Sequence, residues 1–341
     1  MPNINEIIEK FLIGLSDRQR KIIEARFGLK REIKTLAAIG EEYGLTRERI
    51  RQIEAASLGI IRGKYNKSSF VKEIEKVVNH LNKIGGVRKE NDFINDIKNI
   101  FNDSKITKNQ AKFIFEISKA LLYRQENDYF YSFWYLNKDI FSKVNDFINK
   151  LEKFLNNKKE EIITFKKFDE LFAQAVKTHN LSDSIAFNYV SISKKFGVNV
   201  YGDFGLMEWE EINPTTAKSR TYLILKKHGT SLHFKEIAKK INEMRLGNRK
   251  TLFQTVHNEL IKDPRFVLVG RGMYGLAECG AMPGTAKEVI LRILKNKGPL
   301  PKKEIVDLVK QERMLKENTI LLNLQNKKHF KKLPNGKYHI A

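Results

Sequence analysis

The two short helices expected on either side of Gly44 constrain the fold of this chain more than any other sequence feature. Thr35 is suited to cap the first helix, Gly44 to end it, and Thr46 to cap the second. An upstream helix with a cap at Ser16 and a stop at Gly28 completes a three-helix unit. Two short helices joined by a glycine turn are typical of a helix-turn-helix, whose second helix lies in the major groove of DNA.

The second helix of this pair has an apolar and a polar side. At about 100° per residue, Ile50 and Ile53 fall on one side and must face the core. The polar side comprises Glu48, Arg51, Gln52 and Ala55, with Arg47 and Arg49 on its flanks. Arginine can donate two hydrogen bonds to guanine, glutamine can pair with adenine and glutamate can accept from cytosine, so this side suits contact with base edges. The alternative is a solvated helix held by ion pairs at i, i+4. Glu48 and Gln52 form no such pair, and Arg47 would repel Arg51.

The three-helix segment of residues 16–62 contains Arg26-Phe27-Gly28-Leu29, Leu36-Ala37-Ala38-Ile39-Gly40 and the run from Thr46 to Glu54. In these residues, segment 16–62 of the 341 resembles region 4 of bacterial housekeeping sigma factors. The resemblance implies recognition of a promoter −35 element and docking on the flap of the RNA polymerase β subunit. By position, it implies base contacts from Arg47, Glu48 and Gln52, to which the outward side adds Arg51, and phosphate contacts from Arg18, Arg26, Thr35, Thr46, Arg49 and Arg51.

Two features depart from the sigma pattern. Region 4 ends a sigma factor, whereas here the similar stretch begins the chain, and we expect no upstream region that melts a −10 element. The aromatic run from Tyr129 to Tyr135 is an alternative candidate for melting, because exposed aromatic rings stack on unpaired bases. Consecutive aromatic residues without helical spacing favour a buried or half-buried strand instead. We therefore do not expect complete sigma activity.

From residue 70 onward one pattern recurs at intervals of about 60 residues. An apolar-striped helix, a turn and two further helices are followed by strand residues around a hairpin turn. Hairpin turns are indicated at Tyr201-Gly202-Asp203, Gly270-Arg271-Gly272 and Pro334-Asn335-Gly336. The expected fold is therefore mainly α with small β wings, built from tandem helix-turn-helix and winged-helix modules. The expected modules are 1–66, 67–148, 149–215, 216–279 and 280–341, and one irregular helical domain is the alternative for residues 70–215.

The fourth module carries a second resemblance, in the run from Leu232 to Ala238 and the ending from Phe266 to Leu276. These residues are similar to the HARE helix-turn-helix module of the RNA polymerase delta subunit, some restriction endonucleases and eukaryotic chromatin proteins, which implies contact with DNA or polymerase. We expect Asn248 to cap the third helix of this module. The DNA-contact candidates are then Arg249, Lys250, Thr251, Gln254 and, at the wing tip, Arg271, and in the last module Asn318, Thr319, Lys331 and Lys332.

The distribution of charge favours a polyanionic partner. The chain carries 63 Lys and Arg against 40 Asp and Glu, a formal net charge of +23, and residues 218–341 hold 27 of these basic and 10 of these acidic side chains. Lysine and arginine on one part of a chain neutralise phosphates without reading sequence. Double-stranded DNA is therefore the first expected partner, ahead of an acidic membrane surface.

The sequence contains no motif of known catalysis. A phosphate loop, His-Glu-x-x-His and Gly-x-Ser-x-Gly are missing, and the nearest histidine pair, His228 and His233, is expected to lie in a turn and on the surface. The single cysteine, Cys279, excludes a disulfide framework, and no 18 apolar residues occur together. We expect a non-enzymatic protein of the cytoplasm, associated with the nucleoid, without cofactor, metal, membrane or small-molecule substrate.

These features lead to two functional hypotheses. The first is a sigma-like transcription factor that binds a promoter element in double-stranded DNA through its N-terminal helix-turn-helix and associates with the RNA polymerase core. The second is an RNA polymerase adaptor, a delta-like subunit or a sigma antagonist, which acts by protein contact and has no use for the outward set Arg47, Glu48 and Gln52.

Overall fold

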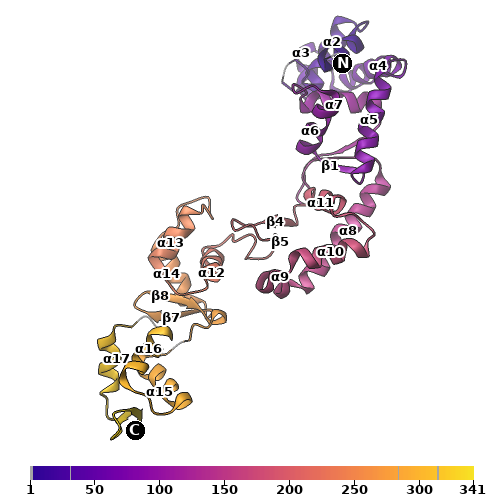
Figure 1. The fold of residues 1–341 in the computed structure, drawn as a ribbon. Helices are drawn as coiled ribbons and strands as arrows, with labels where there is room; N and C mark the ends of the chain where they lie inside the picture. Colours follow the sequence, from indigo (N-terminus) through magenta and orange to yellow (C-terminus); the bar gives the residue numbers. More distant parts are fainter. Residues whose placement is uncertain (1–2, 31, 283, 313–314) are drawn as a thin grey trace. The chain divides into compact units, whose positions relative to one another are not determined.

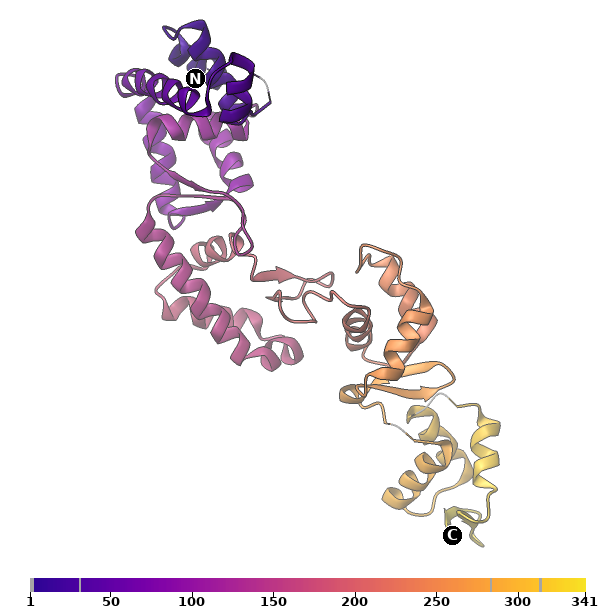
Figure 2. The same ribbon diagram turned by 180° about the vertical axis from the view of Figure 1, so that it is seen from behind.

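The computed structural model describes residues 3–30, 32–282, 284–312 and 315–341. The described residues are mainly helical with small antiparallel sheets, so the predicted fold class is confirmed. They form two compact units, residues 1–196 and 197–341. The elements of each unit can be followed in Figure 1 and, from behind, in Figure 2.

The N-terminal unit is dominated by helices, with one three-stranded sheet of order β1-β3-β2. Its elements are α1 (Ile4–Leu12), α2 (Asp17–Phe27), α3 (Leu36–Tyr43), α4 (Arg47–Asn66), α5 (Phe70–Lys83), β1 (Val87–Lys89), α6 (Glu90–Phe101), α7 (Lys108–Ser118), β2 (Leu122–Arg124), β3 (Phe133–Tyr135), α8 (Lys138–Asn157), α9 (Lys159–Phe165), α10 (Phe168–Thr178) and α11 (Asp183–Ser191).

The C-terminal unit contains two helical groups, each closed by a small sheet. Its elements are β4 (Phe196–Val198), which starts at the boundary, β5 (Phe204–Leu206), α12 (Ala217–His228), β6 (Leu232–His233), α13 (Phe234–Glu243), α14 (Phe253–Lys262), β7 (Phe266–Gly270), β8 (Met273–Leu276), the 3₁₀ helix η1 (Ala277–Cys279), α15 (Ala286–Lys297), α16 (Lys302–Glu312), α17 (Glu317–Leu324), β9 (Phe330–Lys332) and β10 (Tyr338–Ile340).

Local capping chemistry sets the ends of the first helices as predicted. The Ser16 side chain accepts from the backbone N–H of Gln19, whose own side chain accepts from the Ser16 N–H, which completes a capping box on α2. Thr35 caps α3 and Thr46 caps α4 in the same way, each accepting from a backbone N–H three residues later. Because these bonds depend only on neighbouring residues, the sequence alone locates the helix starts.

One hydrophobic core extends through most of the N-terminal unit. It joins buried side chains of α1, such as Ile4 and Phe11, to α5, α6, α7 and the sheet as far as Trp134. The second half of α4 contributes Leu58 and Ile61 to this core. The helix-turn-helix therefore does not stand apart, because its long helix continues into the packing of residues 67–134.

The aromatic run from Tyr129 to Tyr135 forms part of this packing. Phe133 and Trp134 in β3 are 0% and 2% exposed, and β3 lies in the middle of the sheet with antiparallel neighbours on both sides. The prediction of a buried strand is confirmed. Of the run, Tyr129 is 65% exposed, but the buried rings of β3 provide no stacking surface for unpaired bases.

Helix α11 packs against the glycine turn that precedes β1. The Asn188 side chain, 4% exposed, donates to the backbone carbonyl of Ile84 at 2.9 Å and to that of Val87. The Tyr189 hydroxyl donates to the carbonyl of Gly85 at 3.0 Å. Gly85 has a φ of 97°, and a Cβ on it would lie 2.6 Å from Ile185. The turn thus requires glycine, and α11 satisfies the carbonyls that it exposes.

The two helical groups of the C-terminal unit each have a core and a β-hairpin wing. Residues of α12, α13, α14 and the sheet β6-β8-β7 share one core, and residues of α15, α16, α17 and the β9–β10 hairpin share another. The predicted hairpins at 201–203, 270–272 and 334–336 are confirmed by the antiparallel pairs β4–β5, β7–β8 and β9–β10. Within the described ranges, no helix combines the length and hydrophobicity that a membrane crossing requires.

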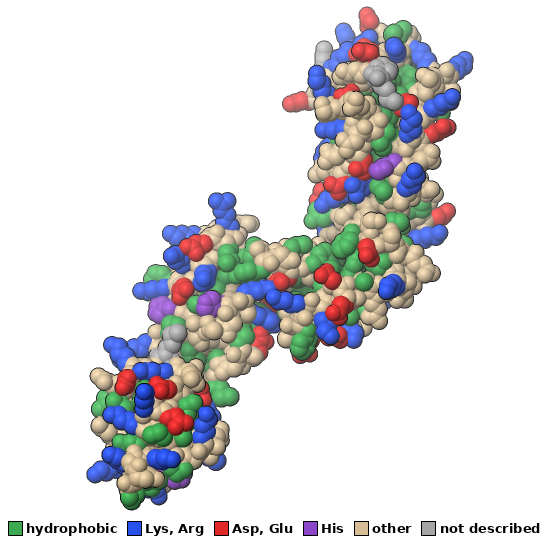
Figure 3. Space-filling view, in the orientation of Figure 1, with side chains coloured by type: hydrophobic (Ala, Val, Ile, Leu, Met, Phe, Trp, Pro, Cys, Tyr) green, Lys and Arg blue, Asp and Glu red, His purple; other side chains and the backbone are tan. Residues whose placement is uncertain are grey.

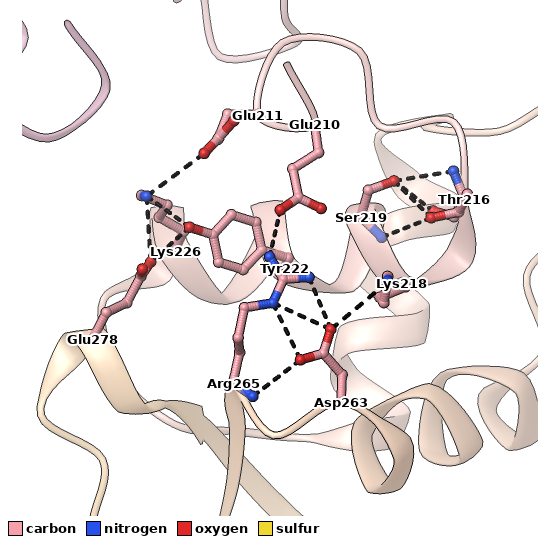
Figure 4. Close-up of polar contacts among 10 residues, drawn as sticks. All are labelled: Glu210, Glu211, Thr216, Lys218, Ser219, Tyr222, Lys226, Asp263, Arg265 and Glu278. Atoms are coloured by element: carbon pink, nitrogen blue, oxygen red, sulfur yellow. Dashed lines mark hydrogen bonds and ion pairs between the residues drawn. The ribbon is translucent and has the colours of Figure 1, made fainter. Parts of the chain in front are cut away.

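A polar network attaches the segment before α12 to the helices that follow (Figure 4). The Arg265 guanidinium lies over the ring of Tyr222, 4.5 Å from the ring centroid, and pairs with Asp263 at 2.9 Å and with Glu210. The Tyr222 hydroxyl donates to the carboxylate of Glu278 at 2.8 Å. Burial, and then this carboxylate, raise the pKa of Tyr222 far above its ordinary value, so the phenol stays a donor. The network fixes the segment around Glu210 to α12.

Candidate nucleic-acid interface

The turn between α3 and α4 brings the two helices unusually close. Gly44 has a φ of 64°, and the N–H of Leu45 donates to the carbonyl of Gly40 at 2.9 Å. A Cβ on Gly40 would lie 2.5 Å from the carbonyl oxygen of Leu45. Only glycine at position 40 allows this approach, and the approach sets the angle at which α4 leaves the turn.

The first turns of α4 separate a buried from an exposed side, as predicted. Ile50 is 0% exposed and packs with Ile22, Ala25 and Ile39, while Ile53 is partly buried against the same cluster. On the opposite side the candidate residues Arg47, Glu48, Arg49, Arg51 and Gln52 are all exposed. A rigid helix therefore presents a row of polar side chains to solvent.

Four of these exposed side chains form two hydrogen-bonded pairs. Arg51 donates to both carboxylate oxygens of Glu48, at 2.7 and 2.8 Å, and Arg49 donates to the amide oxygen of Gln52 at 3.1 Å. The expectation from sequence concerned ion pairs at i, i+4 only, and the ion pair that forms on this side lies at i, i+3 instead. The Arg51 hydrogen bond also holds the pKa of Glu48 below its ordinary value.

The candidate phosphate contacts Arg18, Arg26, Thr35 and Thr46 differ in exposure and in the partners that they already have. Arg18 is exposed, with its guanidinium 5.6 Å from the centroid of the Tyr43 ring. Arg26 is half-buried and pairs with Glu54 of α4 at 3.3 Å. The Thr35 and Thr46 hydroxyl oxygens accept from helix N–H groups as caps, at 3.2 Å in both cases. Of the four, Arg18 is the one with an exposed cationic head that no carboxylate engages in the described part of the chain.

Helix α14 begins later than the sequence predicts. It starts at Phe253, and its N-cap is Leu252 without a side-chain bond, so the Asn248 cap is wrong. Thr251 is 8% exposed, and the side chain of Asn242 binds both its N–H, at 2.7 Å, and its carbonyl, at 2.9 Å. Thr251 is therefore buried, and the prediction that it contacts DNA is wrong.

The other candidates of the C-terminal unit lie on the surface. Arg249, Lys250 and Gln254 are exposed around the start of α14, and Arg271 is exposed at the tip of the β7–β8 hairpin. In the last group, Asn318, Thr319, Lys331 and Lys332 are exposed. Sequence reasoning missed Leu252 and Phe253, which are 58% and 41% exposed next to these cations. The signal that could have found them is a pair of consecutive apolar residues at a helix start. In α14 the core is formed by Val256 and Leu260 further along the helix, which leaves this pair exposed.

The geometry defines a class of protein: helix-turn-helix and winged-helix domains of the kind that bind DNA. Comparison with known families agrees. Residues 11–62 match the family model described as "Sigma-70, region 4". Residues 215–279 match the HARE-HTH family model, whose description includes a "restriction endonuclease HTH domain". Both are DNA-binding helix-turn-helix families rather than enzymes.

Individual relatives match over the N-terminal segment. The RNA polymerase sigma factor SigA of Nostoc sp. is 45% identical over 71 residues, covering 20% of this chain and 18% of the relative. SigA of Microcystis aeruginosa is 44% identical over 71 residues, covering 20% of this chain and 17% of the relative, and the sigma factor RpoS of Coxiella burnetii is 43% identical over 61 residues, covering 18% and 17%. The chain thus matches less than a fifth of the length of these relatives. The similarity supports a sigma-like DNA-binding role for the helix-turn-helix.

Proposed function

We propose that this chain is a sigma-like transcription factor that recognises a promoter element through its helix-turn-helix and associates with RNA polymerase, in initiation or its regulation. The exposed row of Arg47, Glu48, Arg51 and Gln52 carries the proposal. Ile50 fixes the opposite side of α4 in a core, so the row has a defined orientation for entry into the major groove. The β flap of the polymerase is the proposed docking site, by analogy with the sigma factors that share this segment.

The remaining chain has a supporting part in this proposal. It comprises the modules 67–148, 149–215, 216–279 and 280–341, of which the last two contact DNA beside the promoter element or the polymerase itself. Arg249, Lys250, Gln254 and Arg271 are the proposed contacts of the fourth module, because they are exposed at its helix start and wing tip. The protein acts without catalysis or cofactor, on the nucleoid in the cytoplasm.

One observation favours a second candidate, a polymerase adaptor with little affinity for promoter DNA. Arg51 donates to Glu48 and Arg49 donates to Gln52, so these side chains have hydrogen-bond partners within the helix even without DNA. Binding to DNA has to exchange these bonds for contacts with bases and phosphates. Because the pairs are exposed and their side chains are long, the exchange costs little, and we favour the DNA-binding function.

The test combines capture of core RNA polymerase with DNase footprinting of the full chain on promoter DNA. We expect polymerase retention and a footprint over one promoter element, and weaker protection of that element by Arg47→Ala. Retention of polymerase without a footprint would establish the adaptor instead. Permanganate reactivity of promoter thymines adds a further outcome: strand opening by this chain and core polymerase alone would contradict the expectation that it lacks melting activity.

A further inference from the structure

The last 24 residues carry lysines and no acidic side chain. Residues 318–341 contain Lys327, Lys328, Lys331, Lys332 and Lys337 and neither Asp nor Glu. All five lysines are exposed, and none forms an ion pair with a carboxylate of the described residues. In Figure 3, no red side chain is visible around the C-terminal end on the face shown, and the nearest ones lie toward α16 and α17.

The wing that bears three of these lysines is preorganised. Lys331 and Lys332 lie in β9, which pairs with β10, and Lys337 lies at the end of the tight turn between them. The N–H of Leu333 donates to the carbonyl of Lys337 at 2.7 Å. Phe330, 2% exposed, anchors the hairpin in the core of the module. The backbone of the lysines is therefore held in place before any ligand arrives.

Helix α17, which corresponds to the helix that enters the major groove in winged-helix proteins, lacks the positive charge of the wing. Among α17 residues the only charge is Glu317, which pairs with Lys310 at 2.8 Å. The Asn323 amide turns back to donate to the carbonyl of Thr319 at 2.8 Å, and the most exposed apolar side chain is Leu322, at 68%. Within α17 itself the exposed side therefore offers phosphates no cation, and its exposed donors at the helix start are the short side chains of Asn318 and Thr319; the exposed Lys316 is the N-cap.

The fourth module has a different distribution of charge. Its exposed cations Arg249 and Lys250 lie at the start of α14, and the only cation in its hairpin is Arg271. Lys227 and Arg265 pair with the carboxylates of Asp203 and Asp263, whereas Lys235, Arg245 and Lys262 are further exposed cations on or beside its helices. Thus the hairpin of the last module carries three exposed lysines, whereas the hairpin of the fourth module carries one cation.

We propose that the last module binds the phosphate backbone of double-stranded DNA through its wing, with Lys331, Lys332 and Lys337 as the contacts, and that α17 does not contact bases. This inference deepens the proposed function and rests on it. The wing adds affinity that is independent of sequence, whereas α4 supplies the sequence preference. The contacts are cation to phosphate oxygen, so each adds to the dependence of binding on salt.

The experiment compares three variants of the full chain on a duplex of random sequence, by fluorescence anisotropy across a range of KCl concentrations. Lys331→Ala/Lys332→Ala/Lys337→Ala removes the wing contacts. Lys295→Ala/Lys297→Ala/Lys302→Ala removes three exposed lysines of the same module without touching the wing. Asn318→Ala/Thr319→Ala removes two exposed uncharged polar residues at the start of α17.

We expect the slope of log K against log salt to become less steep by about 2.7 in the wing variant, since each phosphate contact contributes about 0.9. The lysine control should change it by less than half as much, and the α17 variant should not change it. Hydroxyl-radical footprinting should show loss of backbone protection at one end of the site for the wing variant only. Circular dichroism verifies that the variants remain folded.

Equal changes for the two lysine triples would overturn the inference, because the charge would then act diffusely, as would a loss of affinity in the α17 variant. The inference would also be overturned if the wing variant lost more affinity for single-stranded RNA or polyglutamate than for the duplex. An unchanged slope in the wing variant, with the preference for promoter over scrambled DNA intact, contradicts this inference alone. A full chain with no affinity for any duplex contradicts the proposed function too.

Discussion

Helices α4 and α11 begin alike and lie in different environments. Each is capped by a hydroxyl: Thr46 accepts from the N–H of Arg49 at 3.2 Å, and Ser182 from that of Ile185 at 3.4 Å. The polar side chains that follow the cap of α4 are exposed, whereas Asn188 of α11 is 4% exposed and bound to carbonyls of the turn before β1.

The difference teaches that a polar helix face predicts a DNA contact only if no backbone group of the same chain binds it first. The turn at Ile84 to Val87 exposes carbonyls that must be satisfied when buried. It lies 104 residues before Asn188 in the sequence, so no local pattern indicates that α11 is held there. Four predictions, in order of decreasing effect, test whether α11 serves stability and α4 serves binding.

Replacement of Gly85 by alanine should have the largest effect on stability. The residue has a φ of 97°, and the new Cβ would lie 2.6 Å from Ile185, so strain and overpacking combine to cost about 2 to 5 kcal/mol of unfolding free energy. Urea unfolding followed by Trp134 fluorescence, in a Trp209→Phe background, measures this cost. Gly44→Ala is the control, because its φ of 64° is also positive but nothing lies within 4 Å of the added Cβ. Equal losses would mean that contact with α11 is unimportant.

Asn188→Ala should destabilise the N-terminal unit by about 1 to 3 kcal/mol, because the carbonyls of Ile84 and Val87 lose a buried donor. The DNA affinity of the folded protein, measured without denaturant, should not change. The matched replacement Asn188→Asp keeps the size of the side chain but puts an acceptor against the two carbonyls, and should destabilise at least as much. A loss of DNA affinity without a loss of stability would show that α11 contacts DNA after all.

Gln52→Ala should show the opposite behaviour. We expect a loss of about 1 to 3 kcal/mol of discrimination between the preferred and a scrambled duplex, and a change in stability of no more than about 0.5 kcal/mol. Arg49→Ala should weaken binding to both duplexes and lower the salt slope by about 1. Because Arg49 donates to Gln52, the double variant is needed to separate the two effects. Equal losses on both duplexes for Gln52→Ala would favour the adaptor function.

The smallest effect concerns the pair of Glu48 and Arg51. Since the hydrogen bond from Arg51 lowers the pKa of Glu48 in the folded protein, the pair is fully formed above the pKa of the unfolded chain and is lost as the pH falls through the lower, folded pKa. A side-chain NMR titration of Glu48 measures this, and Arg51→Ala should move the midpoint upward. An unchanged midpoint in that variant would mean that the pair does not persist in solution.

Local chemistry explains which parts of the fold could be predicted. The caps at Ser16, Thr35 and Thr46 depend on residues three positions away, and the three hairpin turns depend on glycine within the turn. The start of α14 could not be predicted, because Asn242 captures the backbone of Thr251 from the preceding helix. The exposed side of α4 followed from the burial of Ile50, whereas its i, i+3 pairs depend on side-chain conformations that a helical wheel does not describe.

The length of α4 has a mechanical consequence. Its 20 residues span about 30 Å, with the candidate DNA contacts near one end and Leu58, Ile61 and Tyr65 buried in the large core near the other. Because these side chains are packed in the core, α4 cannot rotate or tilt without disrupting that packing. A duplex bound at Arg47 to Gln52 would therefore have a fixed orientation relative to the N-terminal unit. Any torque on the duplex would be transmitted through α4 to the core.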